Sequence, residues 1–248
     1  METNSSPVYV VLGASGGIGS QVARNLSARG GRLVLAARSE DRLNEVSRET
    51  GGVVYPMDAT DSAQVEGLIK FTMEKFGRID GIAHCVGSIL LKPAHLTSVD
   101  EFDQTLKLNL YSAFYVVKYA TRSMFKTGGS IVLCSSAVAK TGLVNHEAIA
   151  SAKAGVLGLV QSAAASYAQR QIRVNCVAPG LVDTPLSARI TGNEASKKHS
   201  EGMHALGRLG TPNDVADAID WLLDRSRSSW VTGQNIGIDG GLSTLRPR

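Results

Sequence analysis

The sequence has few cysteines and no closely spaced pair of them. Cys85, Cys134 and Cys176 are far apart, and each lies in or beside an apolar run. An odd, scattered set provides neither a disulfide framework nor metal-ligand spacing, so we expect small core residues in a reducing cytoplasm and no metal site. The amino terminus lacks the pattern of a signal peptide, and no apolar stretch reaches a membrane-spanning length. No membrane partner is therefore expected.

Charge of one sign and proline are also scarce. The 26 Lys and Arg residues nearly balance the 22 Asp and Glu residues and are scattered along the chain, which does not favour a nucleic-acid partner. Seven prolines against 26 glycines indicate tight turns and no disordered linker. With 248 residues and ordinary hydrophobic content, one domain spanning residues 1–248 is expected.

Apolar runs alternate with amphipathic stretches from one end of the chain to the other. Strands are predicted at 8–12, 32–37, 53–57, 81–85, 130–135, 172–178 and 235–238. Most lack an alternating polar face, which is typical of strands covered by helices on both sides. The pattern predicts an α/β protein, with a single-domain Rossmann-type, doubly wound parallel sheet of about seven strands. Capping signals place helix starts at Ser98, with a helix to about Lys126, and at Thr211. Residues 183–210 interrupt the alternation of predicted strands and helices, because they are polar and show no regular pattern. They are expected to form a substrate lid.

The first strand runs directly into the stretch "GASGGIG", residues 13–19, and then into a helix. Glycine is required where the backbone must turn tightly and approach a phosphate, and the following helix offers its amino-terminal N–H groups to a pyrophosphate. In this context the pattern predicts a dinucleotide-binding loop. The cofactor contacts expected from it are Gly13, Ser15, Gly17, Ile18 and Gly19.

The end of the second predicted strand favours one nicotinamide cofactor over the other. NAD binding requires a carboxylate there for the ribose hydroxyl, whereas NADP binding requires a cation for the 2′-phosphate. Ala37 occupies the carboxylate position and Arg38 follows it. The alternative is a solvated arginine that simply leaves the strand. The sequence predicts NADP(H) as the cofactor.

Further motifs extend this pattern along the chain. They are Asp58 in "MDATD", Gly87 in "HCVG", Asn109 in "KLNL", Ser136 in "IVLCSS", Lys153 in "SAKAG", and Pro179, Gly180 and Thr184 in "IRVNCVAPGLVDTP". Over essentially its whole length the chain resembles the classical short-chain dehydrogenase/reductase family, including members similar to 3-oxoacyl-ACP reductases. The resemblance implies hydride transfer between the cofactor and a small carbonyl or alcohol substrate. It implies catalytic roles for Asn109, Ser136 and Lys153. It implies cofactor contacts by Asp58, Gly87, Lys153, Pro179, Gly180 and Thr184.

One position departs from that family. Its tyrosine, which exchanges the hydroxyl proton, lies four residues before the lysine on the same helix face. Here that position is Ile149, and no tyrosine occurs between Tyr119 and Tyr167. His146 is an alternative acid, although a loop histidine that lines the pocket entrance without taking part in the chemistry is the favoured interpretation. The expected function is an atypical NADP(H)-dependent oxidoreductase, and the alternative is a catalytically silent NADP(H)-binding sensor or structural subunit.

The resemblance also implies a homotetramer. In the family, the helices that begin near Ser98 and near Glu147 pair with the same helices of a second subunit. The later helix of this chain, "AIASAKAGVLGLVQSAAASYA", is rich in alanine and glycine, which lets another helix approach closely.

Overall fold

The computed structural model describes residues 6–246. Residues 1–5 and 247–248, the two ends of the expected 1–248 domain, lie outside the described residues. Seven parallel strands form one sheet in the order β3-β2-β1-β4-β5-β6-β7. They are β1 Val8–Leu12, β2 Arg32–Ala37, β3 Val53–Pro56, β4 Gly81–His84, β5 Gly129–Cys134, β6 Ile172–Pro179 and β7 Asn235–Ile238. The predicted α/β class and seven-stranded parallel sheet are confirmed.

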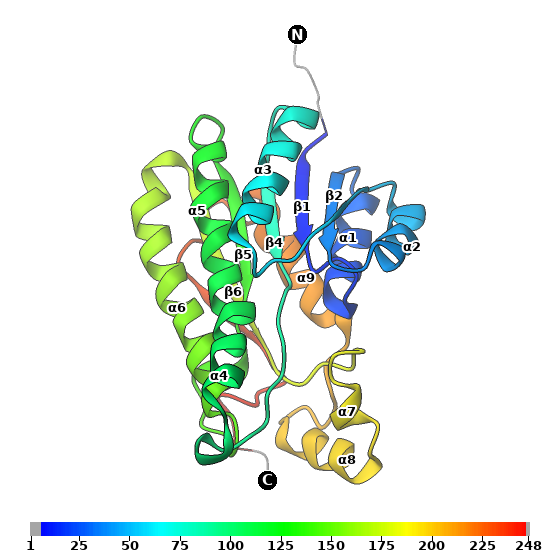
Figure 1. The fold of residues 1–248 in the computed structure, drawn as a ribbon, viewed down its shortest axis with the longest axis vertical. Helices are drawn as coiled ribbons and strands as arrows, with labels where there is room; N and C mark the ends of the chain where they lie inside the picture. The colour runs from blue at the N-terminus through cyan, green and yellow to red at the C-terminus, as the bar shows by residue number, and fades with distance from the viewer. Residues whose placement is uncertain (1–5, 247–248) are drawn as a thin grey trace.

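Helices cover both faces of this sheet (Figure 1). On one face lie α1 (Gly17–Ala28), α2 (Glu40–Thr50) and α9 (Pro212–Leu223), which is followed by the short α10 (Arg225–Ser228). On the other lie α3 (Ser62–Phe76), α5 (Ser112–Met124) and α6 (Glu147–Tyr167). Two buried clusters result, one containing Val22 and Val215, the other Leu68 and Val156. Each such side chain contributes roughly 1.5–3 kcal/mol when fully buried, which explains why the strand sequences lack a polar face.

The long helix expected from Ser98 forms in three pieces. α4 (Val99–Leu106) begins with the predicted capping box, in which Glu101 N–H donates to Ser98 Oγ at 3.2 Å and Ser98 N–H to Glu101 Oε2 at 2.8 Å. A single π-helical segment, η2 (Lys107–Tyr111), then joins α4 to α5. Such π-bulges are frequent at functional sites, and this one contains Asn109.

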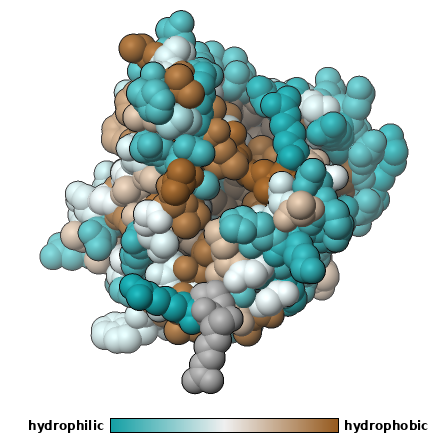
Figure 2. Space-filling view, turned by 90° about the horizontal axis from the view of Figure 1, so that it is seen from below, coloured by the Kyte–Doolittle hydropathy of each residue, from teal (hydrophilic) through white to brown (hydrophobic). Residues whose placement is uncertain are grey.

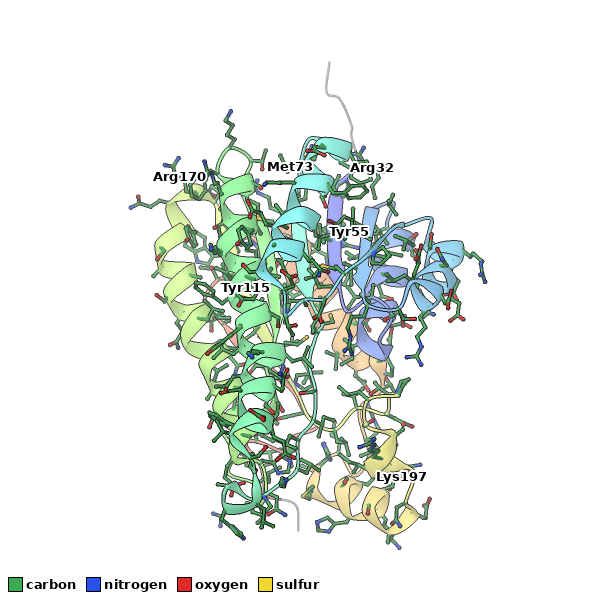
Figure 3. The ribbon with its side chains drawn as sticks, in the orientation of Figure 1. Arg32, Tyr55, Met73, Tyr115, Arg170 and Lys197 are labelled. Atoms are coloured by element: carbon green, nitrogen blue, oxygen red, sulfur yellow. The ribbon has the colours of Figure 1, made fainter. Side chains whose placement is uncertain are left out.

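Residues 183–210 are more regular than the sequence suggested. They contain α7 (Ala188–Thr191) and α8 (Glu194–Met203), which lie beyond the sheet at its lower end in Figure 1. Asn193 caps α8 by accepting from Ser196 N–H at 2.9 Å. Lys197, labelled in Figure 3, belongs to this helix. The expectation of an irregular segment was therefore wrong, because the helices are short and only one face of α8 is apolar or small.

The helical segment Glu147–Arg170 combines α6 with η4 (Ala168–Arg170). By length and composition alone it could cross a membrane, contrary to the expectation that no stretch reaches that length. In this structure α6 packs beside β6 and η2, and 44% of its most apolar 18-residue stretch is buried inside the protein. Core helices of soluble proteins meet the same criterion, so this property is weak support for a membrane span. The remaining short helices are η1 (Ala94–Leu96) and η3 (Ala137–Ala139).

Candidate functional site

A cavity of about 610 Å³ opens at the carboxyl ends of β1, β2 and β4, and we call it the glycine-loop cavity. Gly13 has a positive φ of 78°, and a Cβ there would lie 2.6 Å from the carbonyl oxygen of Cys85. A Cβ on Gly19 would lie 2.2 Å from the carbonyl oxygen of Gly13. The loop therefore requires glycine at both positions. Gly16, the N-cap of α1, provides no side-chain acceptor, so the first-turn N–H groups are available to an anion.

The end of this cavity beside β2 has a basic character. Ala37, Arg38 and Arg42 all line it, and both arginines are exposed. Across from them, Asp58 Oδ1 accepts from Thr60 N–H at 2.9 Å and from Thr60 Oγ1 at 2.8 Å. Sequence reasoning missed Arg42, although its spacing of four from Arg38 at the start of a helix was a usable signal. The lining beside β2 therefore contains two guanidinium groups, from Arg38 and Arg42, together with the carboxylate of Asp58.

The residues expected to contact a cofactor do not all line the same cavity. Gly13, Ser15, Gly17, Arg38, Asp58 and Gly87 line the glycine-loop cavity. Ile18 and Gly19 lie in the first turn of α1 behind the cavity wall, and Pro179 and Gly180 line the neighbouring cavity instead. Thr184 lies against the loop, because a Cβ on Gly17 would be 2.7 Å from Thr184 Cγ2. An added Cβ at Gly13, Gly17 or Gly19 would collide with the protein itself, so these glycines let the loop pack closely at the edge of the cavity.

Lys153 is buried between the two cavities and lines neither of them. Its Nζ donates a 2.8 Å hydrogen bond to the carbonyl oxygen of Cys134, at the end of β5. Burial lowers the pKa of this lysine below its usual value, while the nearby thiols of Cys134, Cys85 and Cys176 act in the opposite direction. A Cβ on Gly87 would lie 3.4 Å from Lys153 Nζ, so the amine stands directly behind the glycine-loop cavity.

Asn109 is fully buried in the π-helical segment, and its side-chain amide is occupied by the chain itself. Its Nδ2 donates to Ser88 Oγ and to the carbonyl oxygen of Thr105, both at 2.9 Å, and its Oδ1 accepts from Ser88 N–H at 3.1 Å. This side chain thus fixes the segment after β4 against the helix. Asn109 is a positioning residue in this arrangement.

A second cavity of about 670 Å³, which we call the apolar cavity, contains the other predicted site residues. Ser136, His146 and Ile149 all line it. Ser136 Oγ lies 3.5 Å from the carbonyl oxygen of Pro179 and accepts weakly from Val138 N–H at 3.4 Å. Figure 2 views this end of the molecule from below and shows apolar residues inside a hollow with a largely polar rim.

Ile149 and His146 present different surfaces to the apolar cavity. Ile149 is only 5% exposed and lies one helical turn before Lys153. The Nδ1–H of His146 donates to the carbonyl oxygen of Val144 at 2.7 Å, which assigns the remaining lone pair to Nε2 when the ring is neutral. The wall of the apolar cavity therefore carries a hydrocarbon group at position 149 and an imidazole at position 146.

Sequence reasoning assigned no role to His84, which lies at the end of β4. Ser112 Oγ donates to the carbonyl oxygen of Leu108 at 2.7 Å, so the 2.9 Å bond between His84 and Ser112 is donated by His84 Nε2–H. His84 Nδ1 has no hydrogen-bond partner among the described residues. Burial, reinforced by the positive charge of Lys153, lowers the pKa of His84 to about 3. This imidazole is neutral throughout the physiological range.

Comparison with known proteins identifies the family of this chain. Residues 13–243 match the family model described as enoyl-(acyl carrier protein) reductase. The chain is 33% identical over 243 residues to the 3-oxoacyl-[acyl-carrier-protein] reductase of Thermotoga maritima, covering 95% of this chain and 97% of that protein. It is 33% identical over 258 residues to the 7alpha-hydroxysteroid dehydrogenase of Bacteroides fragilis, covering 100% and 98%.

Solved structures agree with these relatives. A short-chain type dehydrogenase/reductase from Mycobacterium ulcerans superposes with a TM-score of 0.91 at 32% identity, covering 97% of this chain and 91% of that one. Levodione reductase superposes with a TM-score of 0.92 at 27% identity, covering 97% and 98%. Members of this family bind nicotinamide cofactors. The chain therefore belongs to the short-chain dehydrogenase/reductase family.

Proposed function

We propose that this protein is an NADP(H)-dependent oxidoreductase acting on a small carbonyl or alcohol, with Ile149 in place of the usual catalytic tyrosine. The supporting observation is the placement of Lys153, which is buried behind the glycine-loop cavity. Ile149, one helical turn before Lys153, lines the apolar cavity together with Ser136. When bound, the nicotinamide supplies or accepts a hydride.

Ser136 provides the polar contact for the substrate oxygen. Its hydroxyl faces the apolar cavity, where its hydrogen-bond partners in the chain are distant. Lys153, whose amine lies behind the glycine-loop cavity and is anchored to the Cys134 carbonyl, would hold the cofactor's ribose hydroxyls. Ile149 provides no proton and no hydrogen bond, so negative charge that develops on the substrate oxygen is stabilised less than beside a phenol. We infer a slow reaction whose proton comes from water, from His146 or from the substrate itself.

The preference for NADP(H) rests on the charges around β2. Ala37 offers no carboxylate to a ribose hydroxyl, whereas Arg38 and Arg42 place two guanidinium groups at the same end of the cavity. A 2′-phosphate would be held there by charge-assisted hydrogen bonds, which are stronger than neutral ones. The three cysteines are free, which favours a reducing cytoplasm as the location.

A second function is favoured by Ile149 alone. A protein that binds NADP(H) without reducing anything would act as a sensor or a structural subunit and would have no need of a proton donor. The two functions separate when NADPH binding and NADPH oxidation are measured on the same preparation. Relatives named for a hydroxysteroid and for cis-4-hydroxycyclohexanecarboxylate make cyclic ketones a sensible test panel. Binding together with any ketone-dependent oxidation supports the enzyme, and binding with no oxidation across the panel supports the sensor.

A further inference from the structure

The apolar cavity is lined mainly by hydrocarbon groups from several parts of the fold. Its aliphatic residues include Ile89, Val138, Leu143, Leu181, Ile190 and Met203. Its polar lining consists of serines and histidines, and none of the described residues lining it is Lys, Arg, Asp or Glu. A volume of about 670 Å³ is within the range of pockets that enclose a drug-sized molecule.

The charged residues of the 183–210 segment do not contribute to this cavity. Five positions of α8 line it, namely Ala195, Ser196, His199, Ser200 and Met203. The charged residues of the same helix, Glu194, Lys197, Lys198 and Glu201, are absent from the lining. α8 is therefore amphipathic: its small, polar uncharged and apolar residues line the cavity, and its charged residues do not.

One lining histidine is fixed in its neutral form by the chain. Leu181 N–H donates to His204 Nε2 at 3.1 Å, so His204 Nδ1 carries the hydrogen and donates to the carbonyl oxygen of Ser200 at 2.7 Å. His204 is 2% exposed. It fastens α8 to the segment after β6 and offers no charge to a ligand. Ser136 remains as the hydroxyl that faces the cavity beside Ile149.

We propose that the apolar cavity selects neutral, largely apolar ring ketones or alcohols of drug size and excludes carboxylates and phosphates. An anionic group that entered would lose its hydration and find no cation in the lining, which is the costly case for a buried charge. An apolar ring would bury its surface against Val138, Leu181 and Met203, with its oxygen at Ser136. The inference rests on the proposed function only for the position of that oxygen, because the selectivity follows from the cavity itself.

The test compares two ligands that differ by one negative charge and one methyl group, methyl 4-(4-oxocyclohexyl)benzoate and the free 4-(4-oxocyclohexyl)benzoate anion. Binding is measured by calorimetry with the full chain saturated with NADP⁺, so that no reduction takes place. Both ligands are titrated at pH 8, where the free benzoate is ionised. We expect the ester to bind at least about tenfold more tightly than the carboxylate.

Variants on α8 locate the selectivity. Met203→Lys adds a cation to the lining and is expected to remove most of the tenfold preference for the ester. Gly202→Lys adds the same charge at an exposed neighbouring position where a new side chain meets open space, and it should leave the preference unchanged. If the Met203→Lys variant unfolds, Ile190→Lys on α7 places a cation in the lining of the same cavity and tests the same loss of preference.

Two results would overturn the inference. One is carboxylate binding as tight as that of the ester in the natural protein, and the other is absence of ester binding at millimolar concentration. If the ester binds selectively but is not reduced when NADP⁺ is replaced with NADPH, the proposed oxidoreductase function fails while the inference on selectivity stands. The two failures are thus distinguishable.

Discussion

Ile149 precedes Lys153 by one turn of α6, and the Lys153 ammonium group is anchored 2.8 Å from the carbonyl oxygen of Cys134 rather than by any side chain at position 149. Residues one turn apart share a helix face, so Ile149 lies between the lysine and the apolar cavity. Position 149 thus presents a hydrocarbon side chain to the apolar cavity, which Ser136 also lines.

Cofactor preference is expected to reverse when the charges after β2 are exchanged. Ala37→Asp combined with Arg38→Ala should weaken NADPH binding by about tenfold or more and strengthen NADH binding, because a phosphate contact is replaced by a ribose acceptor. Fluorescence titration of both cofactors measures the change. Arg48→Ala, near the other end of α2 and outside the cavity lining, should have no effect. Equal affinity of the natural protein for both cofactors would refute the preference.

The lowered pKa of His84 is expected to make the protein less stable to unfolding at acidic pH. Its pKa is about 3 in the folded protein against 6.5 for an ordinary histidine. Between pH 6.5 and pH 3 the unfolded chain binds a proton that the folded chain does not, so His84 increasingly destabilises the fold as the pH falls and has no such effect above pH 7.

His84→Asn removes this titration. Relative to the natural protein, the variant should lose about 3 kcal/mol less unfolding free energy between pH 7 and pH 4, at about 1.36 kcal/mol for each pH unit below 6.5. Urea unfolding at the two pH values measures the difference. The exposed His199, replaced in the same way, is the control. Parallel stability curves for the natural protein and His84→Asn would show that the imidazole titrates normally.

Assembly is expected through α4, α5 and α6. Val99 is 77%, Tyr111 44% and Phe114 49% exposed, which is a large apolar surface for one side of a monomer. Ala154 and Gly158 lie on the exposed side of α6 and permit close approach of another helix. Phe114→Glu should dissociate the homotetramer, whereas Lys126→Glu beyond the end of α5 should not. Light scattering reads the mass, and a monomeric natural protein at micromolar concentration contradicts the prediction.

Local sequence signals predicted the sheet and the loop well, because those signals act over short distances. Each predicted strand agrees with the structure to within about one residue at either end, since apolar runs between turn signals mark strands that are buried on both faces. The capping box at Ser98 and the helix start at Thr211 are confirmed, because a cap involves residues only three apart. The loop glycines are likewise required by contacts close in the chain, such as Gly13 against Gly19.

Features that depend on distant contacts were beyond the reach of the sequence. The pairing of His84 with Ser112 joins a strand end to a helix 28 residues away, so no local pattern announces it. The separation of the charged and small residues of α8 became visible only once the helix was placed against the apolar cavity. The π-helical turn around Asn109 interrupts a helix whose apolar pattern gave no indication of a break.

The central claim is that position 149 limits the chemistry. It is tested most directly by the rate of NADPH-dependent reduction of a neutral cyclic ketone by the natural protein, Ile149→Tyr and Ile149→Phe. The phenol should raise the rate by tenfold or more, about the low end of a general-acid contribution, and the phenyl ring without a hydroxyl should not. Ser136→Ala in the tyrosine background should remove the gain. Brisk reduction by the natural protein that His146→Ala abolishes and Ile149→Tyr does not improve would contradict the account and assign the proton to the histidine.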